Sequence, residues 1–139
     1  MAIGSSTGHD GQSRLRLAIF GGTFDPIHIG HLVIAEEARV CLGLHQVIFV
    51  PARKPPHKVG EPNASAEERL EMVRLAIAGN PYFCLSRVDL DREGPSFTVD
   101  TLRAMRADYP RAELFFLMGA DSLIHLRTWH DPQGILRLA

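Results

Sequence analysis

The sequence predicts an α/β fold: a single domain built on a Rossmann-like, doubly wound parallel sheet. Short apolar segments alternate with longer amphipathic segments along the 139 residues, which is the order expected of strand–helix units. The apolar segments are hydrophobic without interruption, as in strands that helices cover on both faces. The chain also has the length of one domain, since domains cluster at roughly 100–150 residues.

Each strand and helix is expected from a pattern of its own. A strand is predicted where a short apolar run ends at glycine or proline, and a helix where apolar residues recur every three to four positions. Ser65 and Glu68 have the spacing of a capping box, which marks a helix start. Residues 1–13 are expected to form a flexible N-terminal lead-in to a domain at 14–139. The predicted strands are 15–20, 46–50, 83–88 and 113–118, and the predicted helices are 30–42, 66–78, 97–108 and one that opens at 119–122.

The composition argues against several functional classes. Fifteen Lys and Arg against sixteen Asp and Glu give a net charge of −1, which is atypical of a uniformly basic nucleic-acid-binding protein. No run approaches the ~18 apolar residues of a membrane span, and the first residues lack the apolar core of a signal peptide. We therefore expect a cytoplasmic protein with no nucleic-acid or membrane partner. Cys41 and Cys84 lie far apart and outside any CxxC pattern, which indicates neither a disulfide framework nor a zinc ribbon.

The segment after the first predicted strand carries the most unusual residues. It reads Gly-Gly-Thr-Phe-Asp-Pro-Ile-His-Ile-Gly-His over residues 21–31. The two glycines predict a tight turn that lets a ligand approach the backbone, and the spacing of His28 and His31 lets both rings face one region at a helix start. Because a helix N-terminus favours anions, the segment predicts a phosphate site. It matches neither the P-loop nor the G-x-G-x-x-G dinucleotide pattern.

This segment is similar to the signature of the nucleotidyltransferase superfamily, and His28-Ile29-Gly30-His31 matches its Thr/His-x-Gly-His motif. Within that superfamily the chain resembles the bacterial nicotinate-nucleotide adenylyltransferases, which implies the nucleotidyltransferase type of Rossmann-like sheet. The resemblance rests on four patches in the same order: residues 21–31, then Val50-Pro51 with Pro55-Pro56-His57-Lys58, then Pro95-Ser96-Phe97-Thr98-Val99-Asp100-Thr101-Leu102, then Gly119-Ala120-Asp121-Ser122 with Leu126 and Trp129.

The resemblance implies adenylyl transfer from ATP to nicotinate mononucleotide, which gives deamido-NAD and pyrophosphate with Mg²⁺ as the cofactor that accompanies ATP. No covalent enzyme intermediate is implied, so catalysis would depend on orientation and on stabilising charge at the transition state. His28 and His31 are then the catalytic pair on the triphosphate. Lys58 would bring a positive charge to the phosphates, with Lys54 as an open alternative, and no side chain is assigned as a metal ligand. Backbone groups of Gly22, Thr23 and Phe24 and the Thr23 hydroxyl are expected to contact phosphates.

The later patches are implied to bind the pyridine substrate. By resemblance, Thr98 lies beside the nicotinate ring, and Trp129 stacks on it with its flat apolar face. Gly119 and Asp121 follow the last predicted strand, where a carboxylate suits ribose hydroxyls.

The same residues could instead have purely structural roles. A His-x-x-His pair also occurs as a metal pair or as helix-start histidines, although no further zinc ligands are evident near it. Trp129 would equally serve as a core aromatic, and Thr98 and Asp121 as helix caps. The remaining histidines, His9, His45, His57, His125 and His130, are taken as surface residues.

Two alternative functions remain open. The pantetheine-phosphate adenylyltransferases have a similar first motif, but they usually carry Thr where His28 stands, and they lack the Pro-Pro-His-Lys and Pro-Ser-Phe-Thr patches. The other alternative is a nucleotide-binding fragment without catalytic activity. The family normally continues to a second phosphate motif, Ser-Ser/Thr-x-x-Arg, which is not found here, so the domain is expected to lack its usual C-terminal portion and to be weakly active or inactive alone. Acid or amide preference and a possible homo-oligomer are left open.

Overall fold

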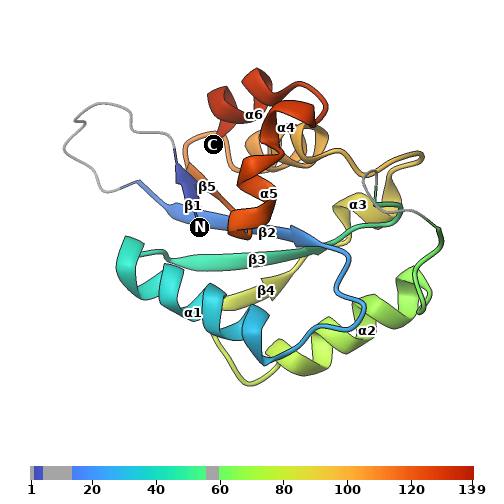
Figure 1. The fold of residues 1–139 in the computed structure, drawn as a ribbon. Helices are drawn as coiled ribbons and strands as arrows, with labels where there is room; N and C mark the ends of the chain where they lie inside the picture. Colours follow the sequence, from blue (N-terminus) through green and yellow to red (C-terminus); the bar gives the residue numbers. More distant parts are fainter. Residues whose placement is uncertain (1, 5–13, 56–59) are drawn as a thin grey trace.

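The computed structural model describes residues 2–4, 14–55 and 60–139, and its centre is a five-stranded sheet in the order β1-β5-β2-β3-β4 (Figure 1). Four strands are parallel, with β2 paired to both β3 and β5, and β3 paired to β4. The predicted α/β fold with a parallel sheet is confirmed. The strands are β1 (Ala2–Gly4), β2 (Arg16–Gly22), β3 (Gln46–Pro51), β4 (Phe83–Leu85) and β5 (Glu113–Leu117).

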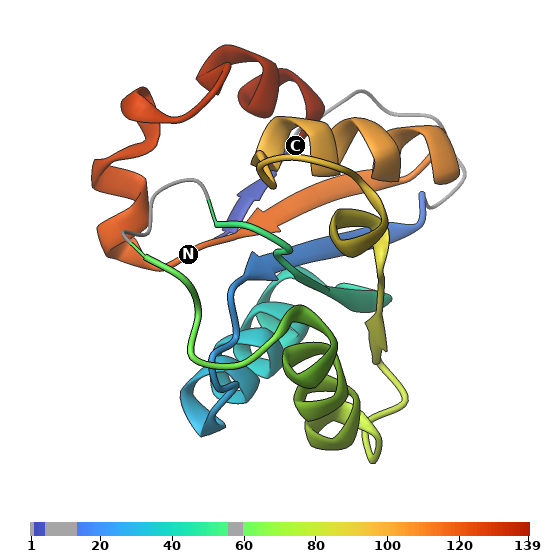
Figure 2. The same cartoon turned by 90° about the vertical axis from the view of Figure 1, so that its right-hand side faces the viewer.

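Helices cover both faces of the sheet, as continuously apolar strands require. Helices α1 and α2 lie on one face, and α4 and α6 on the other (Figure 2). None of the helices in the described part of the chain is long and apolar enough to cross a membrane. The helices are α1 (Ile29–Leu42), α2 (Ala66–Ile77), α3 (Val88–Asp91), α4 (Thr98–Asp108), α5 (Ala120–Ile124), the 3₁₀ turn η1 (Leu126–Thr128) and α6 (Pro132–Leu138).

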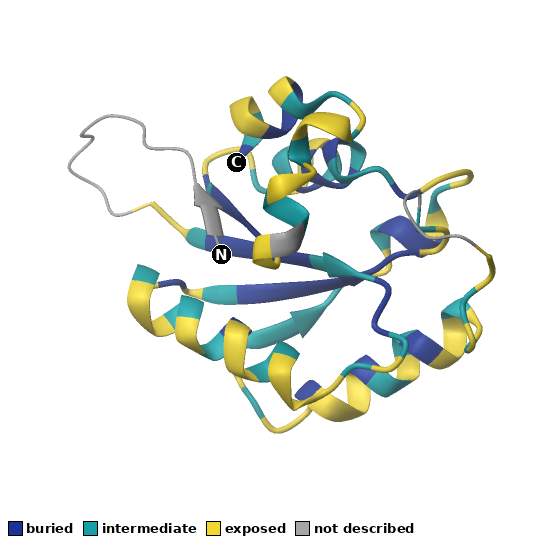
Figure 3. Ribbon diagram, in the orientation of Figure 1, coloured by how far each residue is buried: buried dark blue, intermediate teal, exposed yellow. Residues whose placement is uncertain are grey.

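Two apolar cores result, one on each face of the sheet. Side chains alternate along β2, because successive residues of a strand point to opposite faces. Leu17 and Ile19 pack beneath α4 and α6, whereas Ala18 and Phe20 pack against α1 and α2. The central strands β2, β3 and β5 are accordingly largely buried, and the outer helix faces are exposed (Figure 3).

Two strands differ from the sequence prediction. Ala2–Gly4, expected in a flexible lead-in, pairs antiparallel with β5, where it meets the backbone groups of an edge that would otherwise be unpaired; residues 5–13 lie outside the described part. The strand expected at 83–88 ends at Leu85. Beyond it the Ser86 hydroxyl accepts a hydrogen bond from the Val88 N–H (3.3 Å), and the chain turns into α3.

The capping box at the start of α2 is confirmed. The Glu68 N–H donates to Ser65 Oγ (3.1 Å), and the Ser65 N–H donates to Glu68 Oε1 (3.2 Å). Two N–H groups of the first turn, which have no partner inside the helix, are satisfied in this way.

Replacing Ser65 by alanine is therefore expected to lower the free energy of unfolding by about 1 kcal/mol and Tm by roughly 3–5 °C. Thermal and urea unfolding followed by circular dichroism measures both. The matched control is Ser65→Thr, which keeps an acceptor oxygen and should lose much less. Equal losses for the two variants would contradict the capping role.

Candidate active site

The loop between β2 and α1, residues 23–28, does not begin with the tight turn that was predicted at Gly21 and Gly22. Gly21 and Gly22 are the last two residues of β2, paired with Val50 and Pro51, so the expected tight turn at the glycines is wrong. The chain turns instead at Phe24, whose φ of 51° lies in the left-handed region. That conformation costs a side-chain-bearing residue roughly 1–2 kcal/mol, and burial of the Phe24 ring, 3% exposed, offsets it.

Two backbone donors of this loop face no protein partner. Within the described part of the chain, neither the Thr23 N–H nor the Phe24 N–H makes a hydrogen bond. Thr23 is nonetheless a buried residue, at 9% exposure. Since buried backbone N–H groups are nearly always paired, these two donors are suited to an incoming acceptor such as a phosphate oxygen.

The histidine pair lies at the N-terminus of α1. The rings of His28 and His31 are stacked, with centroids 3.8 Å apart and planes 29° apart. The His28 N–H donates to His31 Nδ1 (3.1 Å). A neutral imidazole that accepts at Nδ1 carries its proton on Nε2. His31 is thereby held as a hydrogen-bond donor through Nε2, which is the role a phosphate requires.

Burial lowers the pKa of His31, and the neighbouring His28 lowers it further. Protonation of Nδ1 would also abolish its hydrogen bond to the His28 N–H. The fold thus favours the neutral ring of His31 at the helix start.

Gly30 is required by the histidine stack itself. A Cβ at this position would lie 2.9 Å from His28 Cε1 and 3.0 Å from His28 Nδ1. Contacts this short force the His28 ring to move. The glycine between the two histidines therefore sets the position of the first of them.

A cavity of about 210 Å³ opens beside Gly22 and Thr23. Complete small-molecule sites span roughly 300–1,000 Å³, so this volume accommodates one part of a larger ligand. The cavity brings together four of the predicted site residues: Gly22, Thr23, Thr98 and Trp129. The half-buried Trp129 ring packs edge-on against Phe116, with centroids 6.1 Å apart, and it presents surface to the cavity as well as to the core.

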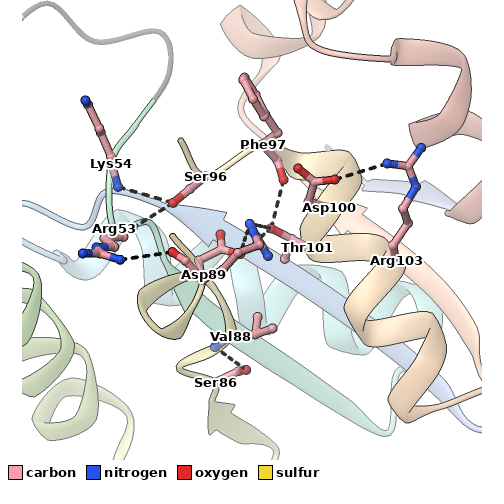
Figure 4. Close-up of polar contacts among 11 residues, drawn as sticks. Arg53, Lys54, Ser86, Val88, Asp89, Ser96, Phe97, Asp100, Thr101 and Arg103 are labelled. Atoms are coloured by element: carbon pink, nitrogen blue, oxygen red, sulfur yellow. Dashed lines mark hydrogen bonds and ion pairs between the residues drawn. The ribbon is translucent and has the colours of Figure 1, made fainter. Parts of the chain in front are cut away.

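The same cavity contains a buried carboxylate that the sequence analysis did not assign. Asp89 is 4% exposed. The Thr101 hydroxyl donates to Asp89 Oδ1 (2.6 Å), and so does Arg92 Nη2 (2.8 Å) (Figure 4). Burial raises the pKa of Asp89, while the bonds from Thr101 and Arg92 counteract that shift. In the sequence, Asp89 directly follows the predicted strand 83–88, and this position at the carboxyl end of a strand could have identified it as a site residue.

Ser96 joins two walls of the cavity. Its hydroxyl accepts hydrogen bonds from the N–H groups of Arg53 (3.0 Å) and Lys54 (3.3 Å), and its own N–H donates to the Lys54 carbonyl (3.0 Å). The segment after β3 is thus fixed to the segment that leads into α4, and the Lys54 side chain extends away from this cluster (Figure 4).

His130 is exposed, as the sequence predicted, and it also lines the cavity. Its ring stacks on Phe97 with centroids 4.4 Å apart and planes 26° apart, and both residues line the cavity. The sequence feature that could have indicated this position is that His130 directly follows Trp129. His45 also has a structural partner, since its Nδ1 accepts a hydrogen bond from the Arg16 N–H (2.9 Å).

The other predicted residues are placed as follows. Thr98 is the first residue of α4 and Phe97 is the N-cap, so Thr98 does not cap that helix. Gly119 is the N-cap of α5, which makes Asp121 the second residue of the helix and not its cap. Among the described residues, Ser122 lines the cavity from this segment, and Gly119 does not. Lys58 lies outside the described residues.

No group of three or more His, Cys, Asp or Glu side chains is placed to hold a metal ion within residues 2–4, 14–55 and 60–139. Mg²⁺ commonly binds through substrate phosphates with one or two carboxylates rather than in an all-protein cage. The donors at the β2–α1 loop, which are N–H groups and imidazoles, fit the phosphates and not the metal itself.

A comparison with protein families gives a match over residues 19–139, to the family described as cytidylyltransferase-like. The chain belongs to the cytidylyltransferase-like family. The matched residues include both the histidine pair and the residues that line the cavity.

Two bacterial relatives of this cytidylyltransferase-like chain carry the same name. A probable nicotinate-nucleotide adenylyltransferase of Thermomicrobium roseum is 55% identical over 124 residues, which are 89% of this chain and 58% of the relative. A protein of the same name from Thermus thermophilus is 53% identical over 121 residues, 87% of this chain and 64% of that protein. The chain thus spans about three fifths of the length of these relatives.

A solved structure shows the same fold. Plasmodium falciparum nicotinic acid mononucleotide adenylyltransferase, complexed with NaAD, superposes with a TM-score of 0.74 at 20% identity, over 88% of this chain and 60% of that one. This supports the nucleotidyltransferase type of sheet that the sequence predicted.

Replacing Gly30 by alanine is expected to weaken the binding of inorganic tripolyphosphate about tenfold, because the added Cβ displaces the His28 ring from the stack. Stability should not fall, since alanine is the better helix former by roughly 1 kcal/mol. Calorimetric titration and thermal unfolding measure the two effects. The control is Gly79→Ala, where the added Cβ meets nothing within 4 Å. Unchanged affinity in Gly30→Ala would contradict this role of the glycine.

The lowered pKa of His31 predicts a pH dependence of folding. The unfolded chain, with a histidine pKa of about 6.5, binds the proton more readily than the folded one, so stability is present above that pH and is lost as the pH falls. We expect the free energy of unfolding to fall more between about pH 7.5 and pH 5.5 in the native protein than in a His31→Phe variant. Urea titrations at both pH values test this, and equal falls would refute it.

Proposed function

We propose that the chain binds ATP and nicotinate mononucleotide and carries the adenylyl-transfer chemistry that yields deamido-NAD and pyrophosphate, a step in NAD biosynthesis. The observation that carries this proposal is the stacked pair of His28 and His31, with His31 oriented as an Nε2 donor. The same loop carries the N–H groups of Thr23 and Phe24, which make no hydrogen bond among the described residues, and the Phe24 and His31 rings lie 5.1 Å apart between centroids. Several hydrogen-bond donors on one short segment at a helix N-terminus suit a polyphosphate. The names of the bacterial relatives supply the acceptor.

In this reaction a phosphate oxygen of the mononucleotide forms a bond to the α-phosphorus of ATP. The bond from that phosphorus to the oxygen shared with the β-phosphorus breaks, and pyrophosphate leaves with the electron pair. The chain would orient the two substrates and donate hydrogen bonds to the phosphate oxygens that gain charge. We assign these hydrogen bonds to His28, His31 and the loop N–H groups. Mg²⁺, bound with ATP, would neutralise phosphate charge.

The cavity would take the pyridine half of the acceptor. Trp129 offers an aromatic face, and Thr98 at the start of α4 offers a hydroxyl and a backbone N–H. Aromatic faces attract flat rings, typically with a gain of roughly 0.5–1.5 kcal/mol beyond burial. Cys41 and Cys84 are both free thiols, which is compatible with the reducing cytoplasm where we place this reaction.

The experiment supplies ATP labelled on its α-phosphate together with nicotinate mononucleotide or 4′-phosphopantetheine, and follows the labelled product. Binding of each substrate is measured in parallel by calorimetry and by Trp129 fluorescence, because the chain spans only part of the length of its relatives. We expect both ATP and the pyridine mononucleotide to bind, and the label to enter deamido-NAD only.

The variants His28→Ala and His31→Ala are expected to lower turnover on the order of 10²-fold, because each removes a contact made in the transition state. Glu71→Ala, on the exposed face of α2, is the control. Label in a phosphopantetheine product, or full turnover by both histidine variants, would contradict the proposal. Binding of both substrates without turnover would show the non-catalytic alternative.

A further inference from the structure

We propose that Arg69 is a positioning residue for the β2–α1 loop: its buried guanidinium sets the direction of the Phe24 N–H and so tunes the affinity for the ATP phosphates. This inference rests on the proposed function for the identity of its ligand. The residue stands in the first turns of α2, amid charged residues that are exposed, yet it is itself 1% exposed. A buried guanidinium requires partners for its donors.

The partners of Arg69 are backbone carbonyls of loops that follow two neighbouring strands. Its Nη1 donates to the carbonyls of Thr23 (2.8 Å) and Ala52 (2.6 Å). Its Nη2 donates to the carbonyl of Arg53 (3.3 Å), and its Nε to that of Ala64 (3.2 Å). One planar group thus fixes the loop after β2 against the loop after β3.

The bond to Thr23 has a direct consequence for the donor next to it. The Thr23 carbonyl and the Phe24 N–H belong to the same planar peptide unit, and in a trans peptide they point in opposite directions. When the carbonyl is held toward Arg69, the Phe24 N–H is held away from it. That N–H is one of the two loop donors left unpaired among the described residues.

Asp25 makes a second connection between the β2–α1 loop and the segment that precedes α2. Its carboxylate accepts the N–H groups of Asn63 (2.6 Å) and Ala64 (3.1 Å). Burial lowers the pKa of Arg69, and the attraction of Asp25 opposes that shift. The loop is therefore bonded to the α2 lead-in both through Arg69 and through Asp25, which explains how a turn at positive φ keeps one conformation.

A lysine cannot reproduce this geometry. Its ammonium is a compact point charge with rotatable donors, whereas the arginine fork reaches several carbonyls in one plane. The variant Arg69→Lys therefore keeps the charge and removes the alignment, and Arg69→Met removes both. The matched controls are Arg74→Lys and Arg74→Met, on the same helix, where Arg74 is exposed and forms an ion pair with Glu71.

The experiment measures, in the full chain, dissociation constants for MgATP, inorganic tripolyphosphate and nicotinate mononucleotide at a temperature where each variant is folded by circular dichroism. For Arg69→Lys we expect about a tenfold loss for MgATP and for tripolyphosphate, and less than about a threefold loss for the mononucleotide as read by Trp129 fluorescence. The Arg74 variants should bind all three ligands as the native chain does.

A merely structural role would weaken all three ligands alike, because general loosening does not distinguish them. An equal loss for phosphate and pyridine ligands in Arg69→Lys therefore overturns the proposal, and so does native affinity for tripolyphosphate. If Arg69→Met does not fold, Arg69→Lys decides alone. Tripolyphosphate also separates the two proposals: selective loss of its binding supports the role of Arg69 even where no adenylyl transfer is detected.

Discussion

The parallel pairing of β2 with strands on both sides is the constraint on which the rest of the site depends. Its pairing with β5 ends at Phe20 and Leu117, but its pairing with β3 continues to Gly22 and Pro51. The chain therefore leaves the sheet beside β3. The carboxyl ends of parallel strands share one edge, and Gly21 and Gly22, which extend beyond the pairing with β5, line the cavity together with Phe116 and Trp129.

Among the described residues, the β2–α1 loop and the start of α1 offer N–H groups and imidazoles as hydrogen-bond donors. Burial and the hydrogen bond that His31 Nδ1 accepts from the His28 N–H both favour the neutral ring of His31. The loop N–H groups carry only partial charge, and the first turn of α1 has no acidic residue. Such a set recognises a small anion by direction as well as by charge. That fits a chain whose net charge is −1 and whose ligand-facing edge nonetheless suits phosphates.

Sequence patterns predicted the features that depend on residues close together in the chain. The parallel strands, the capping box at Ser65 and the shared helix start of His28 and His31 all follow from spacing along the chain. What the sequence left open depends on burial between distant segments. Arg69 looks like one more charge on an exposed helix, and Asp89 like one more acid in a loop, until the fold removes both from water. Likewise, Ala2–Gly4 forms a strand by pairing with β5, which lies near the other end of the sequence.

Arg69 and Ser96 together show how the two halves of the site are joined. The segment after β3 is bonded on one side to Arg69, through the carbonyls of Ala52 and Arg53, and on the other to Ser96, through the N–H groups of Arg53 and Lys54. Arg69 also holds the loop beside the histidines, and Ser96 leads directly into Thr98. Transfer between two bound substrates requires their reacting atoms to be held within a few tenths of an ångström of a productive distance. Because both supports act on one short segment, the β2–α1 loop and the start of α4 are fixed relative to each other.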